Sequence, residues 1–178
     1  MHTKVVFRAA KALAAIGCTV LRFNFRGVGR SEGEFDDGLG EMDDFRSALQ
    51  FMANRAPNLD LWAGGFSFGS WVALSVGSAD DRVSTLLGIG VPAGQYDFDP
   101  LVGSRKPTFL VHGEFDEICP LSDVRRLYGR LDEPKELVVI DGADHLFEGQ
   151  TSEVGDAVHD LLSDFPSDEL GNPGVAHA

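Results

Sequence analysis

A serine between closely spaced glycines is the first candidate for chemistry in this sequence. The segment Gly65-Phe66-Ser67-Phe68-Gly69 follows the largely apolar residues 59–64 and precedes the apolar residues 70–76. A strand that turns sharply into a helix needs glycine on both sides of the turn, because larger side chains would clash there. Such a turn lifts the serine hydroxyl to a helix N-terminus, where free N–H groups stabilise negative charge. Ser67 is therefore the predicted nucleophile.

Two other functions of glycine-rich segments fit this sequence poorly. A phosphate-binding P-loop would need a lysine directly after Gly69, where Ser70 stands. The stretch 27–32 has Glu32 where a dinucleotide-binding fingerprint needs a glycine. The remaining alternative is a turn without chemistry, so the assignment depends on whether an acid and a base accompany Ser67.

Two later loops carry an acid and a base in a suitable order. Asp116 follows the apolar run 107–111, and His145 follows the apolar run 136–140. A serine hydroxyl is a weak nucleophile at neutral pH, so it needs a histidine base that an acid holds in the right tautomer. The carboxyl ends of parallel strands gather such residues at one edge of a sheet. Ser67, Asp116 and His145 are therefore the predicted catalytic residues; the competitors for the acid are Asp97, Glu114 and Glu117.

Strand and helix patterns alternate along the chain. Runs rich in β-branched and aromatic residues predict five strands, at 19–25, 59–64, 83–91, 107–111 and 136–140. Helical spacing of apolar residues predicts helices at 5–16, 42–52, 70–76, 121–131 and 154–165. This alternation indicates an α/β fold, with a mostly parallel sheet covered by helices on both faces. We expect one domain over residues 1–165 and a polar tail over residues 166–178.

Charge and composition exclude several functional classes. The formal net charge of the 178 residues is -13, which argues against binding nucleic acid or an anionic membrane surface. No apolar run has the length of a membrane span or a signal peptide, so we expect a cytoplasmic protein. The two cysteines, Cys18 and Cys119, suggest neither a disulfide scaffold nor a metal cluster. No metal or organic cofactor is indicated.

Four motifs in order carry a resemblance to a known family. Residues 21–33, 65–69, 112–116 and 142–145 make the chain resemble the α/β-hydrolase superfamily, in particular small capless bacterial hydrolases related to dienelactone hydrolase and the prolyl-oligopeptidase catalytic domain. The resemblance implies Ser67 as nucleophile, Asp116 as acid, His145 as base and the Phe68 N–H as an oxyanion donor. Dienelactone hydrolase itself uses a cysteine nucleophile, so the serine here favours esterase-like or peptidase-like acyl transfer.

The front end of the chain departs from this family pattern. Its members begin with further strands and a loop that supplies a second oxyanion N–H, whereas Met1 stands almost at the start of the first predicted helix. We therefore expect an N-terminally shortened fold; a fragment, a misplaced start and a true loss all remain open. A missing strand would leave an exposed sheet edge, which favours association. Self-association into a homo-oligomer is left open on that ground.

The stretch where many such hydrolases insert a lid is short here. Only residues 93–106 lie between the predicted strands 83–91 and 107–111, so we expect no lid domain and an open site. Tyr96 and Phe98 in this stretch are candidates for lining an acyl pocket.

The predicted function is hydrolysis of a carboxylic ester, or less readily an amide or thioester, through an acyl-enzyme at Ser67. The partner would be a small-molecule acyl substrate, with water as the second reactant. The alternative is a hydrolase-fold protein with weak or no catalysis that acts as a binding or interaction module. The missing oxyanion segment supports that alternative, and the complete set of serine, acid and base argues against it.

Overall fold

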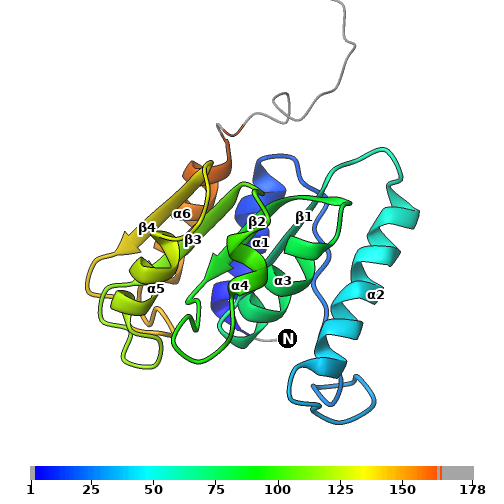
Figure 1. The fold of residues 1–178 in the computed structure, drawn as a ribbon, viewed down its shortest axis with the longest axis horizontal. Coiled ribbons are helices and arrows are strands. Elements are labelled where there is room, and N and C mark those ends of the chain that lie inside the picture. Colours follow the sequence, from blue (N-terminus) through cyan, green and yellow to red (C-terminus); the bar gives the residue numbers. More distant parts are fainter. Residues whose placement is uncertain (1–2, 164, 166–178) are drawn as a thin grey trace, which may run out of the picture.

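Four parallel strands form the sheet, and helices cover both of its faces (Figure 1). The computed structural model describes residues 3–163 and 165. The strands lie in the order β1 (Leu61–Phe66), β2 (Val83–Ile89), β3 (Thr108–Gly113) and β4 (Lys135–Ile140). The helices are α1 (Lys4–Ala15), α2 (Leu39–Arg55), α3 (Phe68–Ala79), α4 (Asp99–Val102), α5 (Leu121–Tyr128) and α6 (Thr151–Ser163). The predicted α/β class and the parallel sheet are confirmed.

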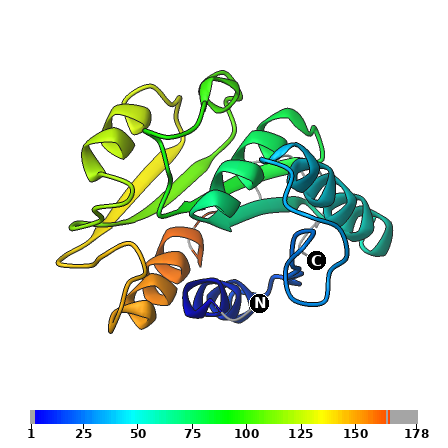
Figure 2. The ribbon, with the colours of Figure 1, turned by 90° about the horizontal axis from the view of Figure 1, so that it is seen from below.

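Each face of the sheet has its own apolar core. Helices α1 and α6 lie on one face, and α2, α3, α4 and α5 lie on the other (Figure 2). Successive side chains of a strand point to opposite faces, so β3 sends Leu110 into one core and Phe109 and Val111 into the other. Because both faces are covered, β3 is buried along its whole length, and its central residues Phe109, Leu110 and Val111 are all apolar rather than alternating with polar ones.

One predicted strand is absent from the sheet. Residues 18–25 have neither helix nor strand structure, and no backbone–backbone hydrogen bond involves residues 19–23 among the described residues. The physical reason is the absence of a neighbour: a cavity separates this segment from β1, so its N–H and C=O groups find no ladder partner. The prediction of five strands is therefore wrong for the described chain, although the residue types of 19–25 favour a strand.

The connection between β2 and β3 contains no lid domain. Residues 90–107 are all described, and they hold a single helix of four residues, α4. The expectation of a lidless domain is confirmed for this stretch. The predicted tail, 166–178, lies outside the described residues. Within the described part of the chain, every helix is too short or too polar to cross a membrane.

Candidate active site

Ser67 stands on the sharp turn between β1 and α3. Its backbone has φ +53° and ψ −128°, a conformation that non-glycine residues rarely adopt. The Ser67 N–H donates to the Ile89 carbonyl at 2.9 Å, which fixes the turn against β2. A Cβ atom on Gly65 would lie only 2.1 Å from the Gly69 carbonyl oxygen, so the turn requires glycine there. The structure thus contains the strained turn that the glycine spacing predicts.

A chain of hydrogen bonds joins the three predicted residues. The Ser67 Oγ lies 2.8 Å from the His145 Nε2, and the His145 Nδ1 lies 2.7 Å from the Asp116 Oδ2. The three side chains come from loops at the carboxyl ends of β1, β3 and β4, as expected for an open parallel sheet. Asp116 and His145 are 4% and 7% exposed, so the relay is shielded from water. This geometry can move the Ser67 proton to His145.

Asp116 is held as a carboxylate by its surroundings. Its Oδ1 accepts the N–H groups of Ile118 at 3.0 Å and Cys119 at 2.7 Å. Burial by itself would raise the pKa of Asp116, but the hydrogen bonds from His145 and the Cys119 N–H outweigh it and leave the pKa below the ordinary value. A buried negative charge therefore lies 2.7 Å from the His145 Nδ1, where it holds the orientation of the ring.

The other candidates for the acid are engaged elsewhere. Glu114 accepts the Gly142 N–H at 2.9 Å, and the Asp97 carboxylate accepts the Asp99 N–H at 2.8 Å. Glu117 is exposed. Of the four carboxylates that the sequence left open, only Asp116 is hydrogen-bonded to His145.

Two glycines that the sequence patterns did not reveal, Gly90 and Gly113, leave room for the loop that carries His145 to pack against the ends of the strands. A Cβ on Gly90 would lie 3.0 Å from the Phe66 ring and 3.4 Å from the His145 Cε1, and one on Gly113 would lie 2.6 Å from the Ala143 carbonyl oxygen. The Phe66 and His145 rings are themselves 5.2 Å apart. No spacing pattern marks these glycines in the sequence, because their neighbours come from other strands.

His112 is a further residue whose contact the sequence did not reveal. It is fully buried at the end of β3, and its Nε2 lies 2.7 Å from the Cys119 carbonyl oxygen and 3.4 Å from the Asp116 Oδ2. Burial lowers the pKa of His112, so the neutral ring is favoured. The Nε2–H tautomer then donates to the Cys119 carbonyl and fastens the loop that carries Asp116. Its place directly after the apolar run 107–111 is the sequence signal that points to such a structural role.

Asp116, Cys119 and His145 also present atoms that could bind a metal. The three ligand atoms lie within 4.8 Å of one another. Both Asp116 oxygens already accept hydrogen bonds, and burial, followed by the charge of Asp116, raises the pKa of Cys119 to about 12. A thiol that stays protonated at neutral pH is a poor ligand. The donor set therefore suits a hydrogen-bonded relay better than a metal centre.

Aromatic side chains gather beside the Ser67 turn. Tyr96 stacks on Trp71 with ring centroids 4.2 Å apart, and the Phe68 ring lies 6.1 Å from Tyr96. Phe98 is only 4% exposed and packs in the core, so the structure does not bring it to this aromatic group. Of the two residues expected to line an acyl pocket, only Tyr96 lies with Phe68.

The first turn of α3 follows Ser67 directly and leaves the Phe68 N–H without an acceptor among the described residues. The N–H groups of Ser70 and Trp71 donate to the Ser67 carbonyl, at 2.8 and 3.3 Å. Phe68 precedes them in the first turn, where an N–H has no intrahelical acceptor. The Phe68 N–H is therefore available to a ligand next to the Ser67 Oγ.

The comparison with known families agrees with this architecture. A family model described as an alpha/beta hydrolase domain matches residues 1–165. The chain belongs to the alpha/beta hydrolase family. This confirms the predicted fold and the family that the four motifs resemble.

Relatives of this hydrolase include uncharacterized proteins and solved structures. It is 39% identical to protein RP471 of Rickettsia prowazekii, a match that covers 91% of this chain and 72% of the relative. It is 26% identical to YfhR of Escherichia coli, over 82% of this chain and 59% of the relative.

Among solved structures, an alpha-beta serine hydrolase homologue from Coxiella burnetii is 33% identical, with a TM-score of 0.82 and coverage of 91% of this chain and 77% of that one. A serine hydrolase without a lid from Xanthomonas campestris is 36% identical, with a TM-score of 0.84 and coverage of 91% and 73%. Both neighbours agree with the hydrolase fold, and the lidless Xanthomonas campestris protein agrees with a capless domain.

Proposed function

We propose that this hydrolase cleaves carboxylic esters, with amides and thioesters as poorer substrates, through an acyl-enzyme at Ser67. The observation that carries the proposal is the continuous hydrogen-bond chain from Ser67 through His145 to Asp116. In this proposal Ser67 is the nucleophile, His145 the base and Asp116 the acid that orients the base, and the order of the three side chains along the hydrogen-bond chain supports these roles. Membership of the hydrolase family supports the same reading.

In the first half of the proposed reaction, the Ser67 Oγ attacks the ester carbonyl carbon while the His145 Nε2 accepts its proton. The carbonyl oxygen becomes an oxyanion, which meets the Phe68 N–H and the positive end of α3. Asp116 stabilises the imidazolium. The intermediate then expels the alcohol, which takes the proton from His145, and leaves the acyl group on Ser67.

In the second half, water takes the place of the alcohol. His145 accepts a proton from the water molecule as its oxygen attacks the acyl carbon, and the collapse of the intermediate returns that proton to the Ser67 Oγ. The products are a carboxylic acid and free enzyme. The Tyr96 and Phe68 rings, whose centroids are 6.1 Å apart, are the proposed contacts for an apolar acyl group, so we expect a small-molecule acyl ester as substrate.

Covalent labelling of the serine tests this proposal. Intact mass after treatment with a fluorophosphonate should show one adduct on the wild type and none on Ser67→Ala. With p-nitrophenyl acetate and butyrate, Ser67→Ala should lower kcat by about 10,000-fold or more. Circular dichroism of both proteins controls for folding.

Folded wild-type protein that takes up no label and turns over neither ester would contradict the proposal. That result would favour the second candidate function, a binding module built on a hydrolase fold.

A further inference from the structure

Aromatic rings surround Phe68, the residue that directly follows Ser67. The centroids of these rings lie 5.6 to 6.1 Å from that of Phe68, and they belong to Phe25, Phe35, Trp71 and Tyr96. Together with Phe68, these residues form an aromatic group. Trp71 and Tyr96 stack with an angle of 19° between their planes. Tilted and stacked pairs at such distances are favourable for aromatic rings. The nucleophile therefore borders a surface made of ring faces and ring edges.

Phe35 is the most exposed member of the aromatic group. It is 63% exposed, whereas the other four rings are partly buried. It lies on the Phe35 loop, residues 26–38, which leads into α2. Phe68 packs against part of the Phe35 ring, with 5.6 Å between the centroids. The rest of the ring is open, so a planar group of a ligand can stack on it.

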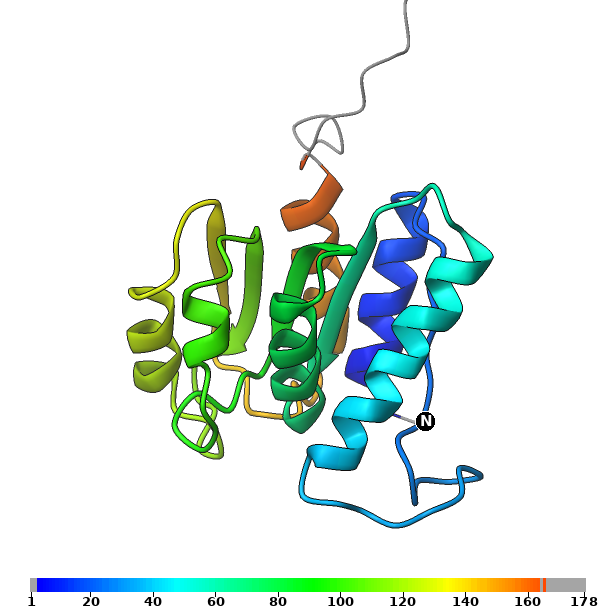
Figure 3. The ribbon, with the colours of Figure 1, turned by 45° about the vertical axis from the view of Figure 1, so that its right-hand side comes forward.

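The Phe35 loop is held in place at both of its ends. In Figure 3, it lies at the end of the molecule where α2 begins. At its start, the Arg26 Nη2 donates to the Asp44 Oδ1 at 2.9 Å. At its end, the buried Glu41 accepts the N–H of Asp36, which directly follows Phe35, at 3.1 Å. The backbone beside Phe35 is therefore fixed before a ligand binds, so ordering this loop costs a ligand little affinity.

The same loop packs directly on Trp71. Gly38 closes the loop with φ +98°, and a Cβ atom there would overlap the Trp71 ring. The Gly38 N–H donates to Glu41 at 2.8 Å. On its other side, the Trp71 Nε1 donates to the Asp97 carbonyl, next to Tyr96, at 3.2 Å. The Phe35 loop, α3 and the stretch that carries Tyr96 thus hold the rings in one arrangement.

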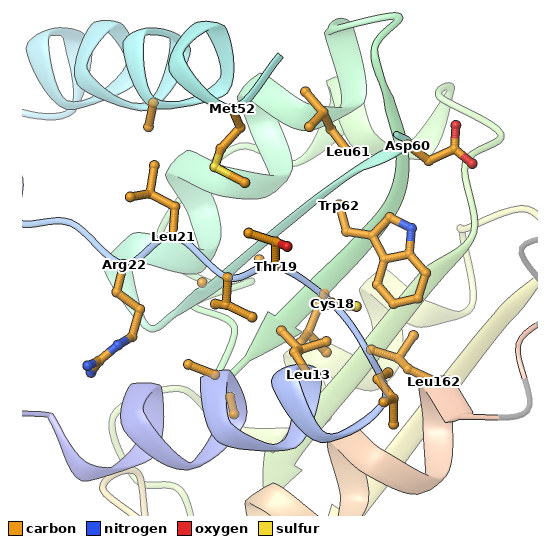
Figure 4. Close-up of a pocket in the computed structure, with 18 of the residues that line it drawn as sticks. Leu13, Cys18, Thr19, Leu21, Arg22, Met52, Asp60, Leu61, Trp62 and Leu162 are labelled. Atoms are coloured by element: carbon orange, nitrogen blue, oxygen red, sulfur yellow. The ribbon is translucent and has the colours of Figure 1, made fainter. Parts of the chain in front are cut away.

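A cavity of about 800 Å³ lies beside β1, but the reacting side chains do not line it. Leu13 and Leu162 are among its lining residues, and Ser67 and His145 are not (Figure 4). In the proposed reaction, the acyl group is bonded to the Ser67 Oγ and needs contacts beside that atom. The aromatic group adjoins Ser67 through Phe68, so it is the better candidate for the acyl subsite.

We propose that this acyl subsite favours esters of neutral aromatic carboxylic acids, and that Phe35 determines the preference by stacking on the acyl ring. The inference rests on the proposed function and names its substrate class. A planar ring gains the energy of an aromatic pair here, whereas a saturated ring gains only apolar contact. Two exposed carboxylates, Glu34 and Asp36, flank Phe35 in the chain, so a negatively charged ring would be repelled.

Two p-nitrophenyl esters of equal carbon number test the preference. Benzoate is planar and cyclohexanecarboxylate is not. Phe35→Ala should lower the ratio of kcat/KM for benzoate to that for cyclohexanecarboxylate about three- to tenfold, the range of one aromatic pair. Phe35→Leu should lower the ratio as well, because it keeps apolar area but no ring, and Phe35→Tyr should retain it. Phe51→Ala is the matched control: Phe51 is 53% exposed on α2 and lies outside the aromatic group, so this variant should keep the wild-type ratio.

A binding measurement gives a readout that does not need turnover. The chain has two tryptophans, Trp62 and Trp71, so their indole N–H signals are separate reporters in an NMR titration. Ser67→Ala titrated with ethyl benzoate should show shifts of the Trp71 signal that exceed those of Trp62. Adding Phe35→Ala should weaken this binding about three- to tenfold. Ethyl cyclohexanecarboxylate should bind more weakly to Ser67→Ala and lose less with Phe35→Ala.

The outcomes separate this inference from the proposed function. Fluorophosphonate labelling of Ser67 together with a benzoate ratio that Phe35→Ala or Phe35→Leu leaves unchanged would overturn the aromatic preference and leave the proposed function standing. Folded protein that takes up no label would contradict the proposed function, and the titration then decides. Binding of ethyl benzoate that shifts Trp71 and weakens with Phe35→Ala would support an aromatic site, and the absence of such a shift would overturn it.

Discussion

At the scale of single residues, the Ser67 turn depends on how closely two stretches of backbone approach. Gly65→Val would place a Cβ about where the Gly69 carbonyl stands, at 2.1 Å from its oxygen. The turn must open to relieve this clash, so we expect a loss of 1–3 kcal/mol in the free energy of unfolding, about the cost of overpacking. We also expect p-nitrophenyl ester turnover to disappear. Urea unfolding and an esterase assay measure the two effects.

Gly103→Ala is the matched control for this prediction. Gly103 lies at the end of α4 with no atom within 4 Å of an added Cβ, and its φ of −93° is accessible to alanine. Gly103→Ala should leave esterase activity unchanged and the free energy of unfolding equal or slightly higher. A Gly65→Val protein as stable and active as wild type would refute the close approach at the turn.

His112 predicts a pH dependence of stability. Burial lowers its pKa in the folded protein, so the unfolded chain binds a proton more readily than the folded one. Stability should therefore be full above the unfolded pKa of about 6.5 and fall as the pH drops from there toward the folded pKa. His112→Gln should remove the part of the pH dependence of stability that comes from His112. Urea midpoints between about pH 7 and pH 5 test the difference.

The exposed histidine on α6 supplies the control for this pH prediction. His159→Gln alters a side chain with 48% exposure, and it should keep the wild-type slope. Identical slopes for wild type and His112→Gln would show that the neutral His112 ring does not contribute to folding.

At the scale of elements, α2 is anchored by a buried carboxylate in its first turn. Glu41 is 1% exposed and accepts the N–H groups of Gly38 at 2.8 Å and Asp36 at 3.1 Å. Glu41→Gln replaces one acceptor oxygen with a donor, so one of these N–H groups loses its partner. We expect a loss of about 1–2 kcal/mol in the free energy of unfolding, measured by urea denaturation.

A neighbouring acidic residue separates this effect from a simple change of charge. Asp43→Asn removes an exposed carboxylate that pairs with Arg46, and exposed pairs of this kind contribute less than about 1 kcal/mol. If both substitutions shift the urea midpoint equally, the anchoring role of Glu41 is wrong.

At the scale of the whole molecule, the excess of acidic residues should make stability depend on salt. The chain carries 28 acidic and 15 basic residues, and its net charge is -13. Repulsion within such a chain disfavours the compact state, and salt screens it. Raising NaCl from about 0.01 M to about 0.15 M shortens the Debye length from roughly 30 to 8 Å, so the Tm should rise.

Scanning calorimetry at neutral pH measures this effect. Repeating the series with KCl distinguishes general screening from the binding of one cation, since screening predicts equal shifts. A Tm that falls with either salt would mean that local ion pairs, such as Arg26 with Asp44, outweigh the repulsion.

Much of the site followed from the sequence because its signals are local. Glycine spacing, a turn serine and apolar runs act over a few residues, so they predicted the Ser67 turn and four of the five strands. The order of Ser67, Asp116 and His145 along alternating strands then placed all three at one edge of the sheet. These inferences needed only the pleat of a strand, the period of a helix and the parallel connection.

Only the tertiary structure decided which residues contact one another when they lie far apart in the chain. Asp116 rather than Glu114 contacts His145, because the loops after β3 and β4 bring the Asp116 carboxylate to the His145 Nδ1. The Glu114 carboxylate accepts the Gly142 N–H instead. Phe98 packs in the core with side chains that lie far from it in the sequence, so its burial could not be predicted from neighbouring residues. Residues 19–25 favour a strand by their types, yet they form none, because a strand exists only where a neighbouring backbone accepts its hydrogen bonds.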